Sequence, residues 1–395
     1  MPITAALAGD LSIIADTLWS TAAALTEGGR LRRSGCRAEI AVVEGADAMA
    51  LAEPAWRSIE EAGGAATAFQ TFAVAKRAAE AHLRRDEIPR IVMVRDGDRP
   101  MVVFPIALAR RGGITAARFL GDPLIQYGDV VAAPGATMAH LEAAWHAVAD
   151  PAAAQFIHLR KVRADARVAP LLARTAIVVA EHEAPYVDVR AQTAIGPRDA
   201  RELRRFRRRL AEQGDLHFDV LSGSAAQTAV REALAIKRDW LAARGMPSSV
   251  IGNASWEEAL MMLVSPEPTP IRVARLKAGG RTAAIEVGFI HGPVWYAYIG
   301  ATAPFAAKAG PGHVQMAELL AHCRAERLAT YDLQAPADPY KRTIAHGTVA
   351  VRDHAAMLTA SGWLGLAAAR ASSAAKNLLT RMPPGLRRAL MRLRN

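Results

Sequence analysis

One short pattern occurs twice in this chain of 395 residues and constrains its fold more than any other feature. Each copy is a pair of apolar runs separated by a turn that contains glycine, and a helical pattern precedes each pair. The runs lie at 91–94 and 101–104 in the first copy and at 271–276 and 282–290 in the second. The turns are Asp96-Gly97, a strong hairpin signal, and Gly279-Gly280. We therefore predict a tandem duplication of one α/β unit.

Chain length also favours two domains, because single cores rarely grow beyond about 250–300 residues. Pro185, Gly196 and Pro197 interrupt the pattern, so we place the boundary between Glu183 and Pro197. The fold class we predict is α/β, with a mixed twisted sheet flanked by helices in each domain. The expected parts are an N-terminal arm at 1–35, domains at 36–190 and 191–360, and a basic tail at 361–395.

Local signals place individual elements. A strand is expected at 38–43, and helices at 47–61, 69–84, 200–213 and 228–244, the last one ended by Gly245. Pro54 is expected to kink or break its helix, and Pro105 to begin a sheet edge or a bulge. A third strand of the second copy is expected at 294–299.

Composition excludes several classes of protein. Apolar residues make up 51% of the chain and charged residues 22%, which is typical of globular domains rather than disordered ones. Cys36 and Cys323 lie far apart, and neither sits in a Cys/His cluster, so we expect neither a zinc site nor a disulfide framework. Asp10 and Asp16 interrupt the N-terminal apolar stretch, which argues against a signal peptide. We expect no transmembrane helix and a cytoplasmic location.

The net charge of +11 is concentrated in the tail. Residues 361–395 carry seven basic residues and no acidic ones, which accounts for +7. Leu386, Leu390 and Leu393 share one helical face, and arginines occupy the others. A basic amphipathic helix of this kind is expected to bind an anionic membrane surface peripherally. The alternative is that the tail packs on the protein itself or is disordered.

A glycine-containing loop follows the run at 294–299 and opens a predicted helix at 313–326. Glycines let a backbone approach an anion closely, and a helix N-terminus offers unpaired N–H groups. The pattern suits the pyrophosphate of coenzyme A, although an ordinary loop that ends in a helix cap explains it equally well. The candidate binding residues are Lys308, Gly310, Gly312 and His313.

Several polar residues are candidates for chemistry. A carboxylate in an apolar strand needs a partner, so Glu286 is a candidate base, although an outward position explains it equally well. Asp332 or Asp338 is a second candidate base for an amine or hydroxyl nucleophile. Tyr340 and Lys341 are candidates to stabilise charge on a thiolate or tetrahedral intermediate. The alternative for this later segment is a solvated proline turn.

The predicted helix at 198–209 is rich in arginine, and Arg204, Arg205 and Arg208 are candidate anion-binding residues. A cyclic dinucleotide, an anionic glycan or a lipid phosphate are candidate ligands. The alternative is a solvated, charged helix face.

Five segments taken in order resemble a known family. They are the arginine-rich helix at 201–210, the segment Ile236–Trp240, the strands within 271–299, the Gly310-Pro-Gly312 loop and the segment Asp332–Lys341. Together they resemble the CelD-like branch of the GNAT superfamily, which is related to the Fem-type peptidyltransferases. The first half resembles the degenerate companion domain of such proteins, including Phe104-Pro-Ile and 121–129, so the resemblance covers about residues 38–355.

This resemblance implies a tandem GNAT fold, an acyl-CoA donor such as acetyl-CoA, and a place in exopolysaccharide production. Within the branch, the chain looks most like the acetyltransferases of holdfast polysaccharide. The function we expect is acyl transfer to an amine of an amino sugar or exopolysaccharide precursor. The alternatives are a non-catalytic module that binds a nucleotide second messenger, and aminoacyl transfer from a charged RNA as in the Fem-type relatives. We expect no metal and no DNA partner.

Overall fold

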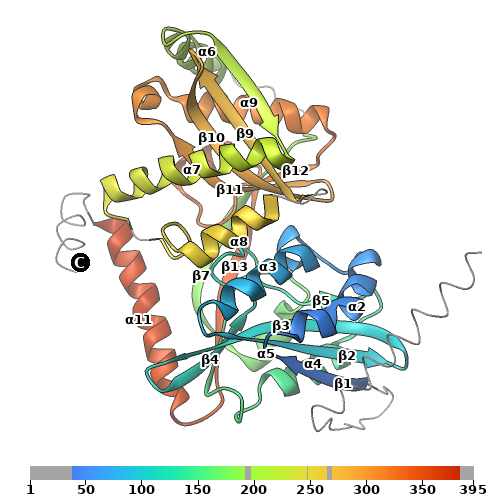
Figure 1. The fold of residues 1–395 in the computed structure, drawn as a ribbon. Helices are drawn as coiled ribbons and strands as arrows, with labels where there is room; N and C mark the ends of the chain where they lie inside the picture. The colour runs from blue at the N-terminus through green and yellow to red at the C-terminus, as the bar shows by residue number, and fades with distance from the viewer. Residues whose placement is uncertain (1–37, 192–196, 247, 265–268, 383–395) are drawn as a thin grey trace, which may run out of the picture. The chain divides into compact units, whose positions relative to one another are not determined.

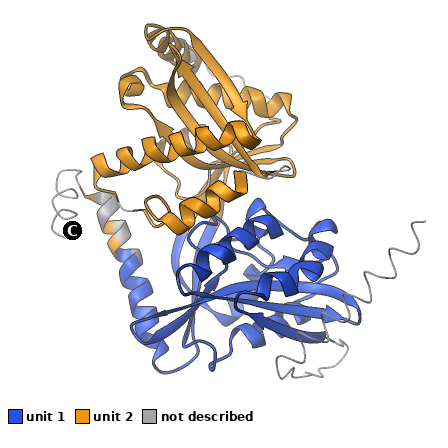
Figure 2. Cartoon of the chain, in the orientation of Figure 1, with its two compact units in different colours: residues 1–181, 351–374 blue, residues 182–350, 375–395 orange. Residues whose placement is uncertain are grey.

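The computed structural model describes residues 38–191, 197–246, 248–264 and 269–382 (Figure 1). The expected N-terminal arm and the amphipathic leucine face of the tail lie outside these residues. The chain divides into two compact units, 1–181 with 351–374 and 182–350 with 375–395 (Figure 2). In the described part of the chain, no helix is both long enough and apolar enough to cross a membrane.

Unit 1 is a sheet with helices packed against it. Its elements in chain order are β1 (Ala38–Glu44), α2 (Ala48–Glu61), η1 (Ala68–Gln70), α3 (Phe72–Leu83), β2 (Ile88–Asp96), β3 (Arg99–Arg111), β4 (Ile114–Phe119), β5 (Val131–Ala132), α4 (Met138–Val148), β6 (Phe156–Arg163), α5 (Ala169–Thr175) and the start of β7 (Ile177–Asp188). The main strands lie in the order β1-β2-β3-β4-β6-β13. Among the described strands of this unit, β4 and β6 run parallel, with Ala116 paired to Phe156 and Ala117 to Ile157.

From β8 onward, unit 2 repeats the order of the main helices and strands of unit 1. Its elements in chain order are the end of β7, α6 (Pro197–Ala211), β8 (Leu216–Leu221), α7 (Gly223–Arg244), α8 (Ala254–Val264), β9 (Ile271–Ala278), β10 (Arg281–His291), β11 (Val294–Thr302), η2 (Pro304–Ala309), α9 (Pro311–Ala325), β12 (Thr330–Asp332), α10 (Pro339–Ile344) and the start of β13 (Gly347–Met357). The strands lie in the order β7-β12-β11-β10-β9-β8. The mixed α/β fold class predicted from the sequence is therefore confirmed, and the main elements from β1 to β7 and from β8 to β13 follow one order.

Each unit completes its sheet with one strand that, from its position in the sequence alone, would be expected to belong to the other unit. In unit 1, residues 351–357 of β13 pair antiparallel with β6, although β13 is the last strand of the chain. In unit 2, residues 186–188 of β7 pair antiparallel with β12, although β7 follows the helices of unit 1. The two units therefore cannot be separated by one cut in the chain.

The structure contradicts a break at Pro54 and the expectation for Pro105. Pro54 lies inside one continuous helix, α2, and does not break it. Pro105 lies in the middle of β3, opposite Ile91 of β2, rather than at an edge or a bulge. The missing N–H of Pro105 is tolerated because pairing with β4 begins only at Ile106, and the Pro105 carbonyl accepts the N–H of Leu120.

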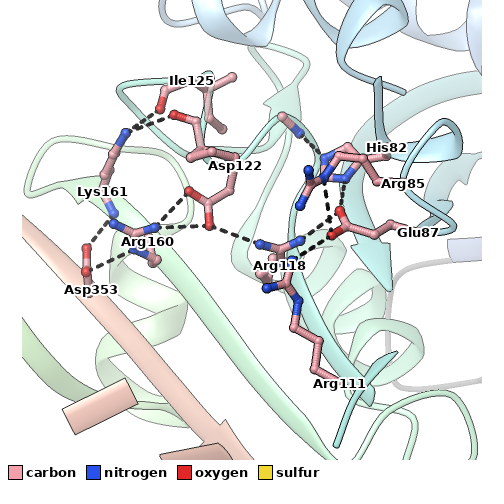
Figure 3. A network of polar contacts seen from close by, with 12 residues as sticks. His82, Arg85, Glu87, Arg111, Arg118, Asp122, Ile125, Arg160, Lys161 and Asp353 are labelled. Atoms are coloured by element: carbon pink, nitrogen blue, oxygen red, sulfur yellow. Dashed lines mark hydrogen bonds and ion pairs between the residues drawn. The ribbon is translucent and has the colours of Figure 1, made fainter. Parts of the chain in front are cut away.

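A charged network is buried inside unit 1 (Figure 3). The Nε2 of His82 accepts the N–H of Gly121 at 2.9 Å, so its Nδ1 carries the proton and donates it to Glu87 at 2.6 Å. Burial lowers the pKa of His82, which keeps the ring neutral. Arg118 donates to the same Glu87 carboxylate at 2.8 Å.

The network continues to the last strand of the chain. Asp122 accepts from Arg160 at 3.1 Å, and Asp353 of β13 accepts from Arg160 at 3.4 Å and from the N–H of Lys161 at 2.8 Å. Lys161 has a left-handed backbone, with φ of +60°, at a register shift between β6 and β13. Asp353 therefore joins β13 to an irregular stretch of β6.

Candidate functional site

The start of α9 in unit 2 is built around two glycines. Gly310 has a φ of +68°, and a Cβ there would lie 2.6 Å from the ring of Phe206. Phe206 of α6 stacks on His313 with ring centroids 4.9 Å apart and an interplanar angle of 10°. Gly310 is therefore required both by its backbone conformation and by the close approach of α6.

Gly312 has a different environment. A Cβ at Gly312 would lie 3.6 Å from the methyl group of Thr302, which is ordinary van der Waals contact. Lys308 and His313 are exposed on either side of this turn. An N-terminal helical turn with an uncrowded backbone, a lysine and a histidine fits an anionic group such as a pyrophosphate. The four residues predicted for donor binding are thus adjacent in the structure.

The strands next to this turn separate from each other. β11 and β12 pair in parallel over three positions only, from Val294 with Thr330 to Tyr296 with Asp332. β12 ends there, whereas β11 continues to Thr302. The register between β10 and β11 also shifts, since Val287 pairs with Ile299 and Gly288 with Ala297. On the side of β12, the second half of β11 therefore has no paired strand, whereas on its other side it still pairs with β10.

Glu286 of β10 is held by two hydrogen bonds. Trp295 Nε1 donates to one carboxylate oxygen at 2.9 Å, and the hydroxyl of Tyr331 donates to the other at 2.8 Å. Trp295 and Tyr331 are register partners on β11 and β12, so strand pairing places both donors together. A Cβ on Gly288 would lie 2.4 Å from the Trp295 indole nitrogen, which explains the glycine at that position.

The carboxyl of Glu286 titrates near neutral pH. Burial raises its pKa to about 7, against the opposing effect of the hydrogen bonds from Tyr331 and Trp295 and of the positive charge of Lys341. The side chain of Glu286 is therefore held within the protein and does not project freely into solvent. A carboxyl with a pKa near the working pH is suited to proton transfer.

The loop after β12 is organised by Lys341. Its Nζ donates to the carbonyls of Gln334 at 2.9 Å and Pro336 at 3.0 Å, and the side chain is buried. Burial lowers the pKa of Lys341, while Asp338 and Glu286 oppose this effect. Lys341 therefore holds the loop in place instead of projecting into solvent.

The other predicted residues of this segment differ in exposure. Asp332 is buried and accepts the N–H of Gln334 at 2.8 Å. Asp338 precedes α10, and its carbonyl accepts the N–H of Lys341 at 2.9 Å. Tyr340 is 52% exposed, and partial burial together with Glu286 and Asp338 raises its pKa to about 12. Of the five predicted catalytic residues, Glu286 and Tyr340 are thus the best placed to exchange protons with a substrate.

Sequence reasoning missed one polar group near the site, Lys237. Lys237 of α7 donates to the carbonyl of Gly300 on β11 at 2.8 Å and lies 4.5 Å from the centre of the Trp240 ring. Burial lowers the pKa of Lys237, and the positive charge of Lys341 adds to this effect. The spacing of Lys237 and Trp240 on one helical face was a usable signal, because residues three apart on a helix are neighbours.

The arginines of α6 lie on the helix face opposite its apolar residues. Arg201, Glu202, Arg204, Arg205 and Arg208 line a hollow of about 660 Å³. Arg205 forms an ion pair with Glu202 at 3.1 Å. The apolar face of the same helix, with Leu203, Phe206 and Leu210, packs in the core of unit 2. Within the described residues, no group of three or more His, Cys, Asp or Glu is arranged to hold a metal ion.

The comparison with family models identifies this region. Residues 198–342 match the model of the acetyltransferase (GNAT) domain. The matched segment lies within unit 2. The match includes α6, the α9 turn, Glu286 and the loop up to Lys341, so the acyltransferase prediction and the site described above refer to the same segment. A GNAT fold implies an acyl-CoA thioester as donor.

Solved structures show the same fold over most of the chain at low identity. The C-terminal domain of a protein described as a lysylphosphatidylglycerol synthetase from Agrobacterium fabrum has a TM-score of 0.52 and 14% identity, covering 81% of this chain and 96% of its own. L-PGS from Bacillus licheniformis has a TM-score of 0.52 and 13% identity, covering 78% and 92%. FemX has a TM-score of 0.52 and 11% identity, covering 77% and 95%. No curated protein sequence matches the chain.

Proposed function

We propose that this chain transfers an acyl group, most simply acetyl, from its coenzyme A thioester to an amine on an amino sugar or exopolysaccharide precursor. The observation that carries this proposal is the carboxyl of Glu286. It has a pKa of about 7, lies inside a GNAT acetyltransferase domain, and is held by Trp295 and Tyr331.

Donor binding is assigned to the start of α9. The backbone around Gly312 and the side chains of Lys308 and His313 receive the pyrophosphate, and Gly310 fixes the turn. The rest of the donor extends along the second half of β11, toward the loop after β12. This arrangement brings the thioester near the side of the sheet on which Glu286 lies.

Proton transfer follows from the two titrating groups. Glu286 as carboxylate accepts a proton from the acceptor ammonium, directly or through one water, and frees the nitrogen lone pair. The nitrogen attacks the thioester carbonyl, a C–N bond forms, and the C–S bond breaks. Tyr340 keeps its hydroxyl proton at neutral pH because its pKa is about 12, and it donates that proton to the leaving thiolate. The new amide nitrogen then releases its excess proton, which restores the Tyr340 hydroxyl.

The acceptor class is supported by the resemblance to the CelD-like branch and by the arginines of α6. Arg204, Arg205 and Arg208 are exposed beside the hollow, where guanidinium groups bind phosphates or carboxylates in bidentate fashion. A sugar nucleotide, an anionic glycan such as a holdfast polysaccharide, or a cyclic dinucleotide carries such groups. The basic tail adds a second proposal, peripheral attachment to an anionic membrane surface.

The test is release of coenzyme A thiol from acetyl-CoA in the presence of a panel of amino sugars and amino-sugar nucleotides. We expect turnover with a free amine and none with the matched N-acetylated compound. Glu286→Gln should lower turnover by roughly 10²–10⁴-fold while donor affinity is retained. The proposal fails if calorimetry detects no binding of acetyl-CoA to the folded wild-type protein.

Aminoacyl transfer from a charged RNA is a second candidate. The fold similarity to FemX and the exposed arginines of α6 favour it. RNA phosphates bound by arginines make affinity strongly dependent on salt. Retention of aminoacyl-RNA at moderate salt, weakened by Arg204→Glu with Arg208→Glu, together with no acetyl-CoA binding, would select this function over acetyl transfer.

A further inference from the structure

Gln334 combines three unfavourable features in one residue. Its φ of +59° lies in the left-handed region, which residues with a side chain rarely adopt. Its side chain is 3% exposed. Within the described residues, its Nε2 has no hydrogen-bond partner although that atom is covered from solvent. Such features persist where the surrounding structure enforces them, and they cluster at binding sites.

The backbone of Gln334 is held firmly from both sides. Its N–H donates to Asp332 at 2.8 Å, and its carbonyl accepts from Lys341 Nζ at 2.9 Å. These contacts fix the peptide groups of the loop and leave the Nε2 without a partner among the described residues. The loop is therefore built to place this side chain, and the neighbouring contacts do not explain why the side chain is an amide.

The position of Gln334 points to a substrate. Gln334 follows Asp332, the last residue of β12 that pairs with β11. It therefore lies where β12 has ended while β11 continues. In the proposed function, the thioester of the donor lies in this region. A carboxamide N–H₂ is a neutral donor, and the thioester carbonyl oxygen is an acceptor on which negative charge develops during attack.

We propose that the carboxamide of Gln334 donates a hydrogen bond to the acyl carbonyl oxygen of the bound donor, so that it is a catalytic residue of the transfer. This inference rests on the proposed function. It also explains why an unpartnered amide persists at Gln334. The bound acyl group supplies the acceptor that the Nε2 lacks in the free protein. Free coenzyme A has no carbonyl at that point and gains nothing from Gln334.

The left-handed backbone allows a test that separates this function from a structural one. Gln334→Gly removes the carboxamide and also relieves the backbone, so the melting temperature should stay the same or rise. Arg327→Gly is the matched control. Arg327 has a φ of +57° in the same unit, is exposed, and lies on the turn after α9, away from this loop.

Calorimetry on the full chain with acetyl-CoA and with free coenzyme A gives the decisive comparison. We expect Gln334→Gly to weaken acetyl-CoA binding about tenfold and leave coenzyme A binding unchanged, and to lower turnover further because the bond strengthens in the transition state. Arg327→Gly should change neither affinity. Equal affinities of wild type and Gln334→Gly for acetyl-CoA, or equal weakening for both ligands, would overturn the inference. If the wild type binds neither ligand, the proposed function itself has failed.

Discussion

Tyr331 on β12 donates its hydroxyl hydrogen to Glu286 on β10 across 2.8 Å. The bond spans the intervening strand β11, which contributes Trp295 as the second donor to the same carboxyl. Three neighbouring strands therefore set the protonation of one side chain. A hydrogen bond to a carboxylate stabilises its charged form and lowers its pKa, whereas burial raises it.

The pH dependence of activity should report this balance. Because the pKa of Glu286 is raised to about 7, the group is protonated and unable to accept a proton at lower pH. We expect kcat/KM for the acceptor to rise with pH up to about 7 and then to level off. Tyr331→Phe removes one stabilising bond, so the midpoint should move to higher pH by roughly 0.5–1 unit. A midpoint that stays in place in Tyr331→Phe would assign the titration to another group.

Two glycines near Glu286 offer a matched pair. Gly288→Ala introduces a Cβ 2.4 Å from the Trp295 indole nitrogen, whereas Gly300, the register partner of Glu286, has no atom within 4 Å of the corresponding position. We expect Gly288→Ala to displace the indole, to alter tryptophan fluorescence and to cost about 1–3 kcal/mol of stability. Gly300→Ala should change neither the fluorescence nor the unfolding midpoint measurably. Similar behaviour of the two variants would contradict the close packing of Trp295 on Gly288.

The two glycines at the start of α9 should separate folding from donor binding. Gly310→Ala forces a Cβ into the ring of Phe206 at a left-handed backbone position, so we expect a loss of stability of about 1–3 kcal/mol. Gly312→Val meets only the Thr302 methyl at Cβ, so the fold should survive while the bulk hinders an anion at the helix start. Thermal unfolding and calorimetry with coenzyme A measure the two effects. Unchanged coenzyme A affinity in folded Gly312→Val would move the donor site elsewhere.

The sequence predicted correctly those turns and helix ends that depend on the conformational preferences of one or two residues. Asp96-Gly97 and Gly279-Gly280 predicted their hairpins, and Gly245 ends α7 with a φ of +61° as expected. Gly310 and Gly312 marked the start of α9. These signals depend on backbone conformations that only a few residue types adopt, so they can be recognised without knowing the tertiary structure.

Long-range pairing could not be predicted from the sequence. The exchange of β7 and β13 between the units joins residues such as Tyr186 and Asp332, which no local pattern connects. The support of Glu286 by Tyr331 likewise depends on the pairing of β10, β11 and β12, which brings together two residues that lie far apart in the sequence. Pro105 misled because a proline is tolerated inside a strand when a neighbouring strand begins one residue later.

Asp353 connects strand β13 to the interior of unit 1. Its carboxylate accepts from the side chain of Arg160 and from the N–H of Lys161, and both acidic neighbours of this network have lowered pKa values. For Glu87 and Asp122, burial alone would raise the pKa. The bond from His82 and the charge of Arg118 at Glu87, and the charges of Arg160 and Lys161 at Asp122, bring each pKa to about 2 instead.

Removing Asp353 leaves the N–H of Lys161 without this acceptor and the partly buried Arg160 with Asp122 as its remaining partner, so Asp353→Ala should destabilise the protein by about 1–3 kcal/mol at pH 7. Asp165→Ala is the control, because Asp165 pairs with Arg163 at an exposed position and should cost less than about 1 kcal/mol. Glu87 and Asp122 have folded pKa values below their unfolded ones. The stability they contribute is therefore present above about pH 4 and is lost as the pH falls toward 2. Denaturant unfolding at pH 7 and at pH 3 measures both effects. Equal losses in the two variants at pH 7 would show that the network contributes no more than a surface ion pair.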